Sequence, residues 1–294
     1  MTLANPIQNG VAQSGGGGGG EGGVAAPQEW ATAYEIDLSA GVETNLLTGG
    51  DGEKTIDGKA WELVNSSEAT AVGVGTTSGG MKITANPASP YSFCQGGSPR
   101  TAAMMRVPLR ELLAGTDAEG RDDIEIRLSY LLLPGGGPSA YQYEGFAHGL
   151  DPRSNTAQSG GMWIWAGHWD NNPTRMRAIM LGTDAGGPTE QTNSEVSVFP
   201  NAYRWLFRDG RLRKSERNSN NTDTDFDAVT WTPVRWAVAS QTELFSLVEG
   251  AADELCLFFA LDNYAGGGAF TSLTLKALRV EWRACLAAST LWRA

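Results

Sequence analysis

Residues 273–283 read Leu-Thr-Leu-Lys-Ala-Leu-Arg-Val-Glu-Trp-Arg, and this stretch decides the fold. Its apolar positions alternate with polar ones, as in a strand with one buried face. They form two sets: Leu273, Leu275 and Ala277, then Val280 and Trp282. The two sets are out of step by one residue at Leu278, which predicts a β-bulge there. The charged positions are expected to face water: Lys276, Arg279, Glu281 and Arg283.

Short strands of this kind recur along the chain, separated by Gly, Pro, Asn and Asp. They are predicted at 34–38, 60–64, 81–85, 124–133, 141–147, 162–166, 175–181, 203–208, 211–214, 228–232, 235–239, 255–261 and 273–282. The dipeptides Asp57-Gly58 and Asp209-Gly210 predict tight hairpins. One short helix is expected over 108–115. The pattern predicts an all-β protein, an antiparallel β-sandwich of jelly-roll type.

Composition excludes several other classes of protein. Of 294 residues, 38 are glycine, yet they follow no three-residue period, so the chain is not collagen-like. A hydrophobic share of 41% with ten tryptophans argues against overall disorder. The net charge of −11 argues against nucleic acid as a partner, because binding phosphates requires a basic surface.

The cysteines and the N-terminal sequence bear on the compartment. Cys94, Cys256 and Cys285 are odd in number and form no CxxC pair, so a disulfide framework or zinc site is not expected. Folding in a reducing cytosol fits this pattern. The first residues show no secretory signal, and no apolar run is long enough for membrane insertion.

Residues 1–29, called here the N-terminal arm, differ from the rest. Gly15–Gly20 are uninterrupted glycine, a composition typical of a flexible linker. The alternative is a docking arm that lies against a partner, since glycine lets a backbone approach a surface closely. We predict docking, with contacts from Leu3, Asn5, Pro6, Ile7, Gln8 and Asn9. Residues 30–283 are predicted to form the β-sandwich, and 284–294 a C-terminal tail.

Two sets of carboxylates have the chemistry to bind calcium or to act on a sugar. Glu35 and Asp37 share one face of a predicted strand. Asp223, Asp225 and Asp227 alternate in a segment rich in Asn, Ser and Thr, where ordinary turn formation is the simpler interpretation. Two such carboxylates facing each other across a groove would serve a glycosidase. The only histidines, His148 and His168, suggest neither a catalytic triad nor a metal site. No catalytic residue, metal or other cofactor is predicted, although calcium stays an alternative.

Aromatic and basic residues suggest binding surfaces. Trp163 and Trp165 are expected in the core, whereas Trp169 stands beside a polar turn. The candidate glycan-binding residues are therefore Trp169, Asp170, Asn171 and Asn172. A basic cluster surrounds the second hairpin: Arg204, Arg208, Arg211, Arg213, Lys214 and Arg217. This cluster is a candidate contact for an anionic glycan or for the acidic arm of a neighbouring subunit.

Four short motifs follow one another within residues 30–85. They are Tyr34-Glu35-Ile36-Asp37-Leu38, Gly49-Gly50-Asp51-Gly52, Ile56-Asp57-Gly58-Lys59-Ala60-Trp61-Glu62 and Gly79-Gly80-Met81-Lys82-Ile83. This order resembles the opening strands of concanavalin-like and laminin-G-like sandwiches in structural proteins of tailed bacteriophages, and 273–283 is similar to their closing strand. A glycine-rich tether before such a domain resembles short phage fibre and decoration proteins. The resemblance implies a virion protein, attached by its N-terminus to other virion proteins and displaying the sandwich outward.

Two functional hypotheses follow from these observations. The first is a non-enzymatic virion protein, of tail-fibre or capsid-decorating type, whose sandwich binds glycans on the host surface. The alternative is a carbohydrate-active enzyme, a polysaccharide depolymerase, that uses Glu35, Asp37 or the 223–227 segment. A homo-oligomer is expected on the particle, with a trimer as the expected form, because repeated weak sites multiply avidity.

Overall fold

The computed structural model describes the chain in separate ranges. These are residues 29–38, 52–64, 69–74, 80–85, 104–136, 144–150, 163–168, 177–181, 183–184, 187–188, 202–218, 224–233, 246–251, 254–263 and 270–285. Within them, no helix is long and apolar enough to cross a membrane.

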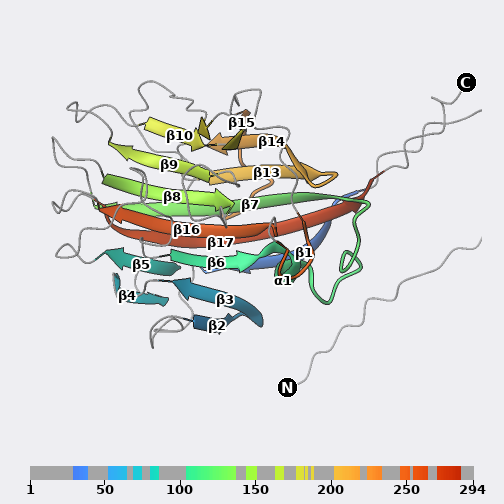
Figure 1. Ribbon diagram of the computed structural model, residues 1–294, viewed down its shortest axis with the longest axis horizontal. Coiled ribbons are helices and arrows are strands. Elements are labelled where there is room, and N and C mark those ends of the chain that lie inside the picture. Colours follow the sequence, from blue (N-terminus) through green and yellow to red (C-terminus); the bar gives the residue numbers. More distant parts are fainter. Residues whose placement is uncertain are drawn as a thin grey trace, which may run out of the picture.

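Two antiparallel sheets stack on each other, and most of their strands run along the long axis of the molecule (Figure 1). The first sheet has the order β15-β14-β13-β7-β17-β5-β4, and β1 also pairs with β17. Its strands are β1 (Ala31–Asp37), β4 (Ala69–Val74), β5 (Met81–Ala85), β7 (Ile124–Gly136), β13 (Ala202–Arg208), β14 (Arg211–Asn218), β15 (Thr232–Pro233) and β17 (Phe270–Ala284).

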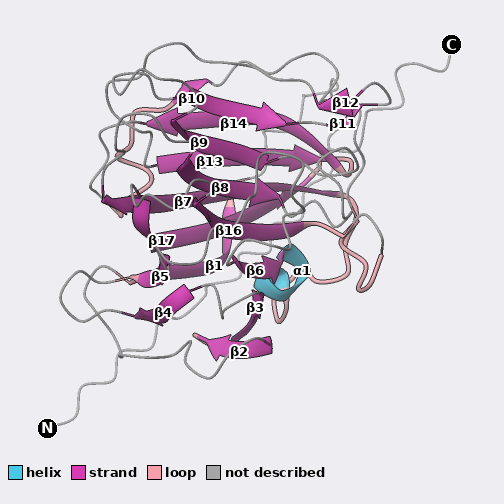
Figure 2. Cartoon of the chain, turned by 60° about the vertical axis from the view of Figure 1, so that its left-hand side comes forward, coloured by secondary structure: helices cyan, strands magenta, loops and turns pink. Residues whose placement is uncertain are grey.

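The second sheet has the order β10-β9-β8-β16-β6-β3-β2 and covers one face of the first (Figure 2). Its strands are β2 (Gly52–Ile56), β3 (Lys59–Val64), β6 (Met104–Pro108), β8 (Glu144–Leu150), β9 (Trp163–His168), β10 (Arg177–Leu181) and β16 (Cys256–Asn263). A small ribbon joins β11 (Thr183–Asp184) to β12 (Gly187–Pro188), and α1 (Leu109–Leu113) follows β6 directly. The predicted antiparallel β-sandwich is confirmed.

Aromatic side chains join the two sheets in the core. Tyr130 of β7 meets Phe259 of β16 edge to face, with ring centroids 5.2 Å apart, and stacks on Tyr203 at 5.6 Å. The indole Nε1 of Trp205 donates a hydrogen bond to the hydroxyl of Tyr130 at 2.9 Å. Burial raises the pKa of Tyr130 well above its ordinary value, so its hydroxyl stays protonated.

The last strand, β17, differs in detail from its prediction. The register with β7 shifts between Leu275 and Ala277, so the bulge falls at Lys276 and not at Leu278. As a result, Leu278 points inward in step with Val280, and Ala277 lies on the outer face. The expectation that the charged residues of β17 face water is also wrong for Glu281, which is 5% exposed.

Local sequence signals located the ends of several strands. Both predicted hairpins form, with positive φ angles at Asp57, Gly58, Asp209 and Gly210, as a two-residue turn between twisted strands requires. The first and last long strands pair directly, from Ala31 opposite Trp282 to Asp37 opposite Ala277, as expected.

The strand predicted at 228–232 is wrong, because residues 226–228 form a turn and 229–231 are irregular. The amide of Ala228 donates to the carbonyl of Asp225 at 3.1 Å, and only Thr232–Pro233 pair as β15. The segment predicted at 235–239 lies outside the described residues.

Gly80 offers a test of how tightly β5 approaches β17. Its φ is +125°, and a Cβ placed there would lie 2.5 Å from Cγ2 of Thr274 and 2.7 Å from the carbonyl oxygen of Leu275. Gly80→Ala is expected to lower the free energy of unfolding by more than about 2 kcal/mol, measured by urea denaturation.

Gly58→Ala is the matched control, because its φ of +72° is also left-handed but nothing lies within 4 Å of the added carbon. It should cost only about 1 kcal/mol. Equal losses for the two variants would contradict the close approach at Gly80.

Candidate functional site

Residues 224–233 lie across the outer face of the first sheet, the face turned away from the second sheet. Phe226 is buried there, 1% exposed, in a cluster with Leu131 of β7, Ala202 of β13 and Ala277 of β17. Trp231 packs against this cluster, with its ring centroid 6.5 Å from that of Phe226. Small and apolar residues on the outer face therefore hold the segment in place.

Arg204 ties the same segment to the sheet. Its Nε donates to the hydroxyl of Ser129 at 3.1 Å, and its Nη2 donates to the carbonyl of Phe226 at 3.0 Å. The guanidinium lies under the indole of Trp231, 4.2 Å from the ring centroid, a cation–π contact. Burial lowers the pKa of Arg204, which the nearby Arg127 also favours.

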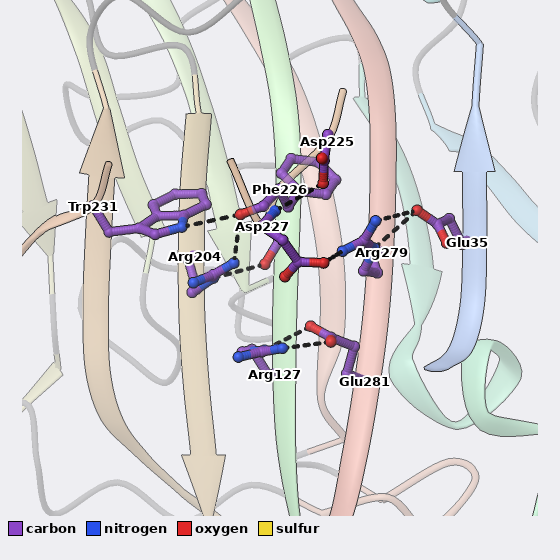
Figure 3. A network of polar contacts seen from close by, with 10 residues as sticks. Glu35, Arg127, Arg204, Asp225, Phe226, Asp227, Trp231, Arg279 and Glu281 are labelled. Atoms are coloured by element: carbon purple, nitrogen blue, oxygen red, sulfur yellow. Dashed lines mark hydrogen bonds and ion pairs between the residues drawn. The ribbon is translucent and has the colours of Figure 1, made fainter. Parts of the chain in front are cut away.

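Arg279 of β17 joins the two acidic segments that the sequence singled out (Figure 3). Its Nε donates to Glu35 of β1 at 2.8 Å, and its Nη1 donates to Asp227 at 2.8 Å. Nearby, the hydroxyl of Thr224 donates to Asp37 at 2.9 Å. Partial burial disfavours the charged guanidinium, but the bonds to Glu35 and Asp227 outweigh it and raise the pKa of Arg279.

Two further arginine–carboxylate pairs cross between β7 and β17. Arg127 lies opposite Glu281 and donates to it from Nε at 2.6 Å, and Arg283 lies opposite Glu125 and donates to it at 2.5 Å. The indole of Trp30 lies over both guanidinium groups, with the ring centroid 4.6 Å from Arg127 and 4.4 Å from Arg283. The carboxylates are 5% and 7% exposed, so the arginines and the indole shield them from water.

These residues, some buried and some exposed, lie together at the outer face of the first sheet, called here the paired-charge face. It consists of Trp30, Glu35, Glu125, Arg127, Ser129, Arg204, Phe226, Asp227, Trp231, Arg279, Glu281 and Arg283. Both indoles remain partly exposed. The surface thus presents aromatic rings and planar hydrogen-bonding groups that are already held in position.

The predicted acidic site has the geometry of a turn and an ion pair. Asp225 accepts a hydrogen bond from the amide of Asp227 at 3.0 Å, as turn-forming aspartates do, and Asp227 is bound by Arg279. Asp223 lies outside the described residues. Within the described ranges, no three His, Cys, Asp or Glu side chains gather as metal ligands would.

The other sequence-predicted sites divide into two groups. The glycan candidates Trp169, Asp170, Asn171 and Asn172 lie outside the described residues, as do the docking residues Leu3, Asn5, Pro6, Ile7, Gln8 and Asn9. The basic cluster lies within the described residues, and three of its members form separate ion pairs. Arg208 contacts Glu125 at 3.3 Å, Arg213 contacts Asp209 at 3.0 Å and Lys214 contacts Glu216 at 2.5 Å.

Sequence reasoning missed Trp30, Trp231, Arg127 and Glu125. A signal for two of them was present, because Glu125 and Arg127 are two residues apart, as are Glu281 and Arg283. Residues two apart share a face of a strand, and opposite charges on neighbouring strands form cross-strand pairs.

Comparison with known proteins gives weak likenesses only. No family model and no curated protein matches the sequence. A GH43 glycoside hydrolase engineered for endo-xylanase and exo-arabinofuranosidase activity is 10% identical in sequence, with a TM-score of 0.39. The match covers 82% of this chain but only 41% of that enzyme. The CBM2 module of the evolved Dit protein of Lactobacillus casei BL23 phage J-1 is 9% identical, with a TM-score of 0.39 over 87% of this chain and 97% of the module. A protein from Shewanella oneidensis MR-1 is 12% identical, with a TM-score of 0.44 over 91% and 92% of the two chains. None of these likenesses bears on function.

Arg279 is expected to contribute to fixing the turn segment to the sheet, together with Phe226 and Arg204. Arg279→Lys keeps the charge but removes the fork that reaches Glu35 and Asp227 together. We expect a loss of about 1–2 kcal/mol in unfolding free energy and faster amide exchange over 224–231, measured by hydrogen exchange and mass spectrometry.

Arg213→Lys is the control, because Arg213 pairs with Asp209 on the exposed hairpin. It should change stability by less than about 0.5 kcal/mol and leave exchange over 224–231 unaltered. Unchanged exchange in Arg279→Lys would show that the packing of Phe226 and the bonds of Arg204 hold the segment without Arg279.

Proposed function

We propose that this protein is a virion component whose β-sandwich binds glycans of the host surface through the paired-charge face, without cleaving them. The observation that carries the proposal is the pair of partly exposed indoles, Trp30 and Trp231, each lying over guanidinium groups. The apolar face of a sugar ring packs on an aromatic ring, while its hydroxyls need hydrogen-bonding groups nearby.

The ion pairs beneath Trp30 and the hydrogen bonds of Arg204 beneath Trp231 favour a rigid binding surface. Bidentate arginine–carboxylate pairs hold their side chains in one geometry, so little conformational entropy is lost when a ligand binds. Because carboxylates already neutralise Arg127, Arg279 and Arg283, and because the chain carries a net charge of −11, the surface favours a neutral glycan over a polyanion.

The virion setting rests on the sequence resemblance and on the N-terminal arm. The arm leads directly into β1, whose first residue, Ala31, pairs with Trp282 of β17. In this proposal, the arm binds another virion protein and the sandwich is held outward from the particle. A homo-oligomer, with a trimer as the expected form, would present several copies of the face and multiply a weak affinity for each glycan.

A depolymerase is the second candidate, because the structure brings Glu35 and Asp37 of β1 next to the turn that carries Asp227. Against it, Arg279 binds both Glu35 and Asp227, whereas a general acid must deliver a proton to the substrate. Glycan binding without cleavage therefore fits these contacts better.

The first test of the proposal is a glycan array with purified protein. Trp30→Ala and Trp231→Ala are each expected to weaken binding by roughly tenfold or more, because each loses a stacking surface. Trp30→Phe should retain part of the affinity. Glu53→Ala, an exposed change on β2 of the other sheet, should bind like the parent protein.

Two outcomes would count against this proposal. Full binding by both tryptophan variants, with unchanged thermal melting, would place the glycan elsewhere. Release of sugar from host polysaccharide, abolished by Glu35→Gln or Asp227→Asn, would favour the depolymerase.

The arm has a separate test. A chain lacking residues 1–23 should keep its glycan binding and its melting temperature but fail to join the particle, because the docking residues are gone. Copy number on purified particles, measured by quantitative mass spectrometry, checks this. A normal copy number would make the arm a spacer.

A further inference from the structure

A pocket of about 610 Å³ lies at one end of the sandwich, near the residues that follow α1. Five parts of the chain form its walls: α1, the turns over 114–122, the start of β7, the β13–β14 hairpin, and residues 246–249 with Leu255. Neither functional hypothesis above assigns a role to this pocket.

The apolar floor of the pocket is formed by side chains at the end of the hydrophobic core. These are Leu113, Ala118, Ile124, Ile126, Phe207 and Leu255. Val248 also lines the pocket, and 68% of its surface is exposed. Among the described residues, it is the large apolar side chain that is exposed. An apolar floor beside an exposed valine suits an apolar occupant better than water.

The mouth of the pocket has an excess of negative charge. Its three arginines are already bound by carboxylates: Arg110 by Glu254 at 2.8 Å, Arg121 by Asp123 at 2.8 Å and Arg208 by Glu125 at 3.3 Å. Glu119 and Asp122 also line the pocket, are exposed, and form no ion pair with another described residue, although Oε2 of Glu119 accepts a hydrogen bond from the amide of Gly115 at 2.7 Å. A cationic group on the occupant would therefore be favoured at this edge.

The chain itself reaches the mouth of this pocket at the end of β17. The amide of Cys285 donates to the carbonyl of Asp123 at 2.7 Å, one residue from the lining residue Asp122. The sequence continues for nine residues, Leu286–Ala294, which include Leu291, Trp292 and Arg293. Nine residues can extend about 30 Å, which is ample to reach any wall of a pocket that begins beside Cys285.

We propose that residues 286–294, the C-terminal tail, dock into this pocket of their own chain. Leu291 and Trp292 would cover the apolar floor, and Arg293 would face Glu119 and Asp122. Such docking closes the exposed end of the core. Because the tail is tethered at Cys285, its effective concentration is in the millimolar range, so even a weak affinity suffices for occupancy. This proposal is independent of glycan binding.

The test uses a fluorescently labelled synthetic peptide of residues 286–294. Fluorescence anisotropy should show sub-millimolar binding to a chain that ends at Cys285. Binding to the full chain should be at least tenfold weaker, because its own tail competes. A full chain carrying Leu291→Ala and Trp292→Ala should bind the peptide as the truncated chain does, which covers the case that truncation impairs folding.

Charge reversal identifies the docking site. Glu119→Lys with Asp122→Lys in the truncated chain should weaken binding of the parent peptide about tenfold and restore binding of a peptide with Arg293→Glu. Glu53→Lys, on β2, should change neither.

Equal binding to the full and truncated chains, no binding to a folded truncated chain, or insensitivity to the charge reversals would overturn the proposal. So would light scattering in which the full chain is an oligomer and the truncated chain a monomer, since the tail would then occupy a neighbour's pocket.

Discussion

The pairing of β7 with β17 is the interaction on which the other features of the structure depend. It runs from Phe270 opposite Gly136 to Ala284 opposite Ile124, along almost the whole of both strands. Its register places Leu128 beside Val280 on the inner face and Arg127 beside Glu281 on the outer face. Because side chains alternate with a period of two, a slip of one residue would bury the ion pairs and expose the core.

The bulge at Lys276 makes the two faces compatible with the sequence of β17. Before the bulge, Leu273 and Leu275 point inward; after it, Leu278 and Val280 do. The extra residue leaves Ala277 on the outer face, where a small side chain gives Phe226 room to pack. A larger residue there would keep the turn segment off the sheet. The position of the turn, and with it the contact of Asp227 with Arg279, therefore follows from the bulge.

Features set by local sequence were predicted well, and features set by distant contacts were not. The two hairpins followed from Asp-Gly dipeptides, and the strand expected at 124–133 lies within β7. The strand expected at 228–232 failed because Phe226 packs against residues from three distant strands, which no local pattern reveals. The paired-charge face was missed for the same reason, since Arg127 and Glu281 are 154 residues apart.

The interpretation of the acidic segments changed once their contacts were known. As sequence, Glu35 and Asp227 were candidates for catalysis or for calcium. In the fold, both are bound by one arginine, and that arginine is 13% exposed. Arg279 occupies one oxygen of each carboxylate, Oε1 of Glu35 and Oδ2 of Asp227, and its positive charge disfavours a cation beside them. The paired state of these charges thus weakens the case for chemistry at this face. The indoles of Trp30 and Trp231 are the partly exposed aromatic surfaces that this face offers to a ligand.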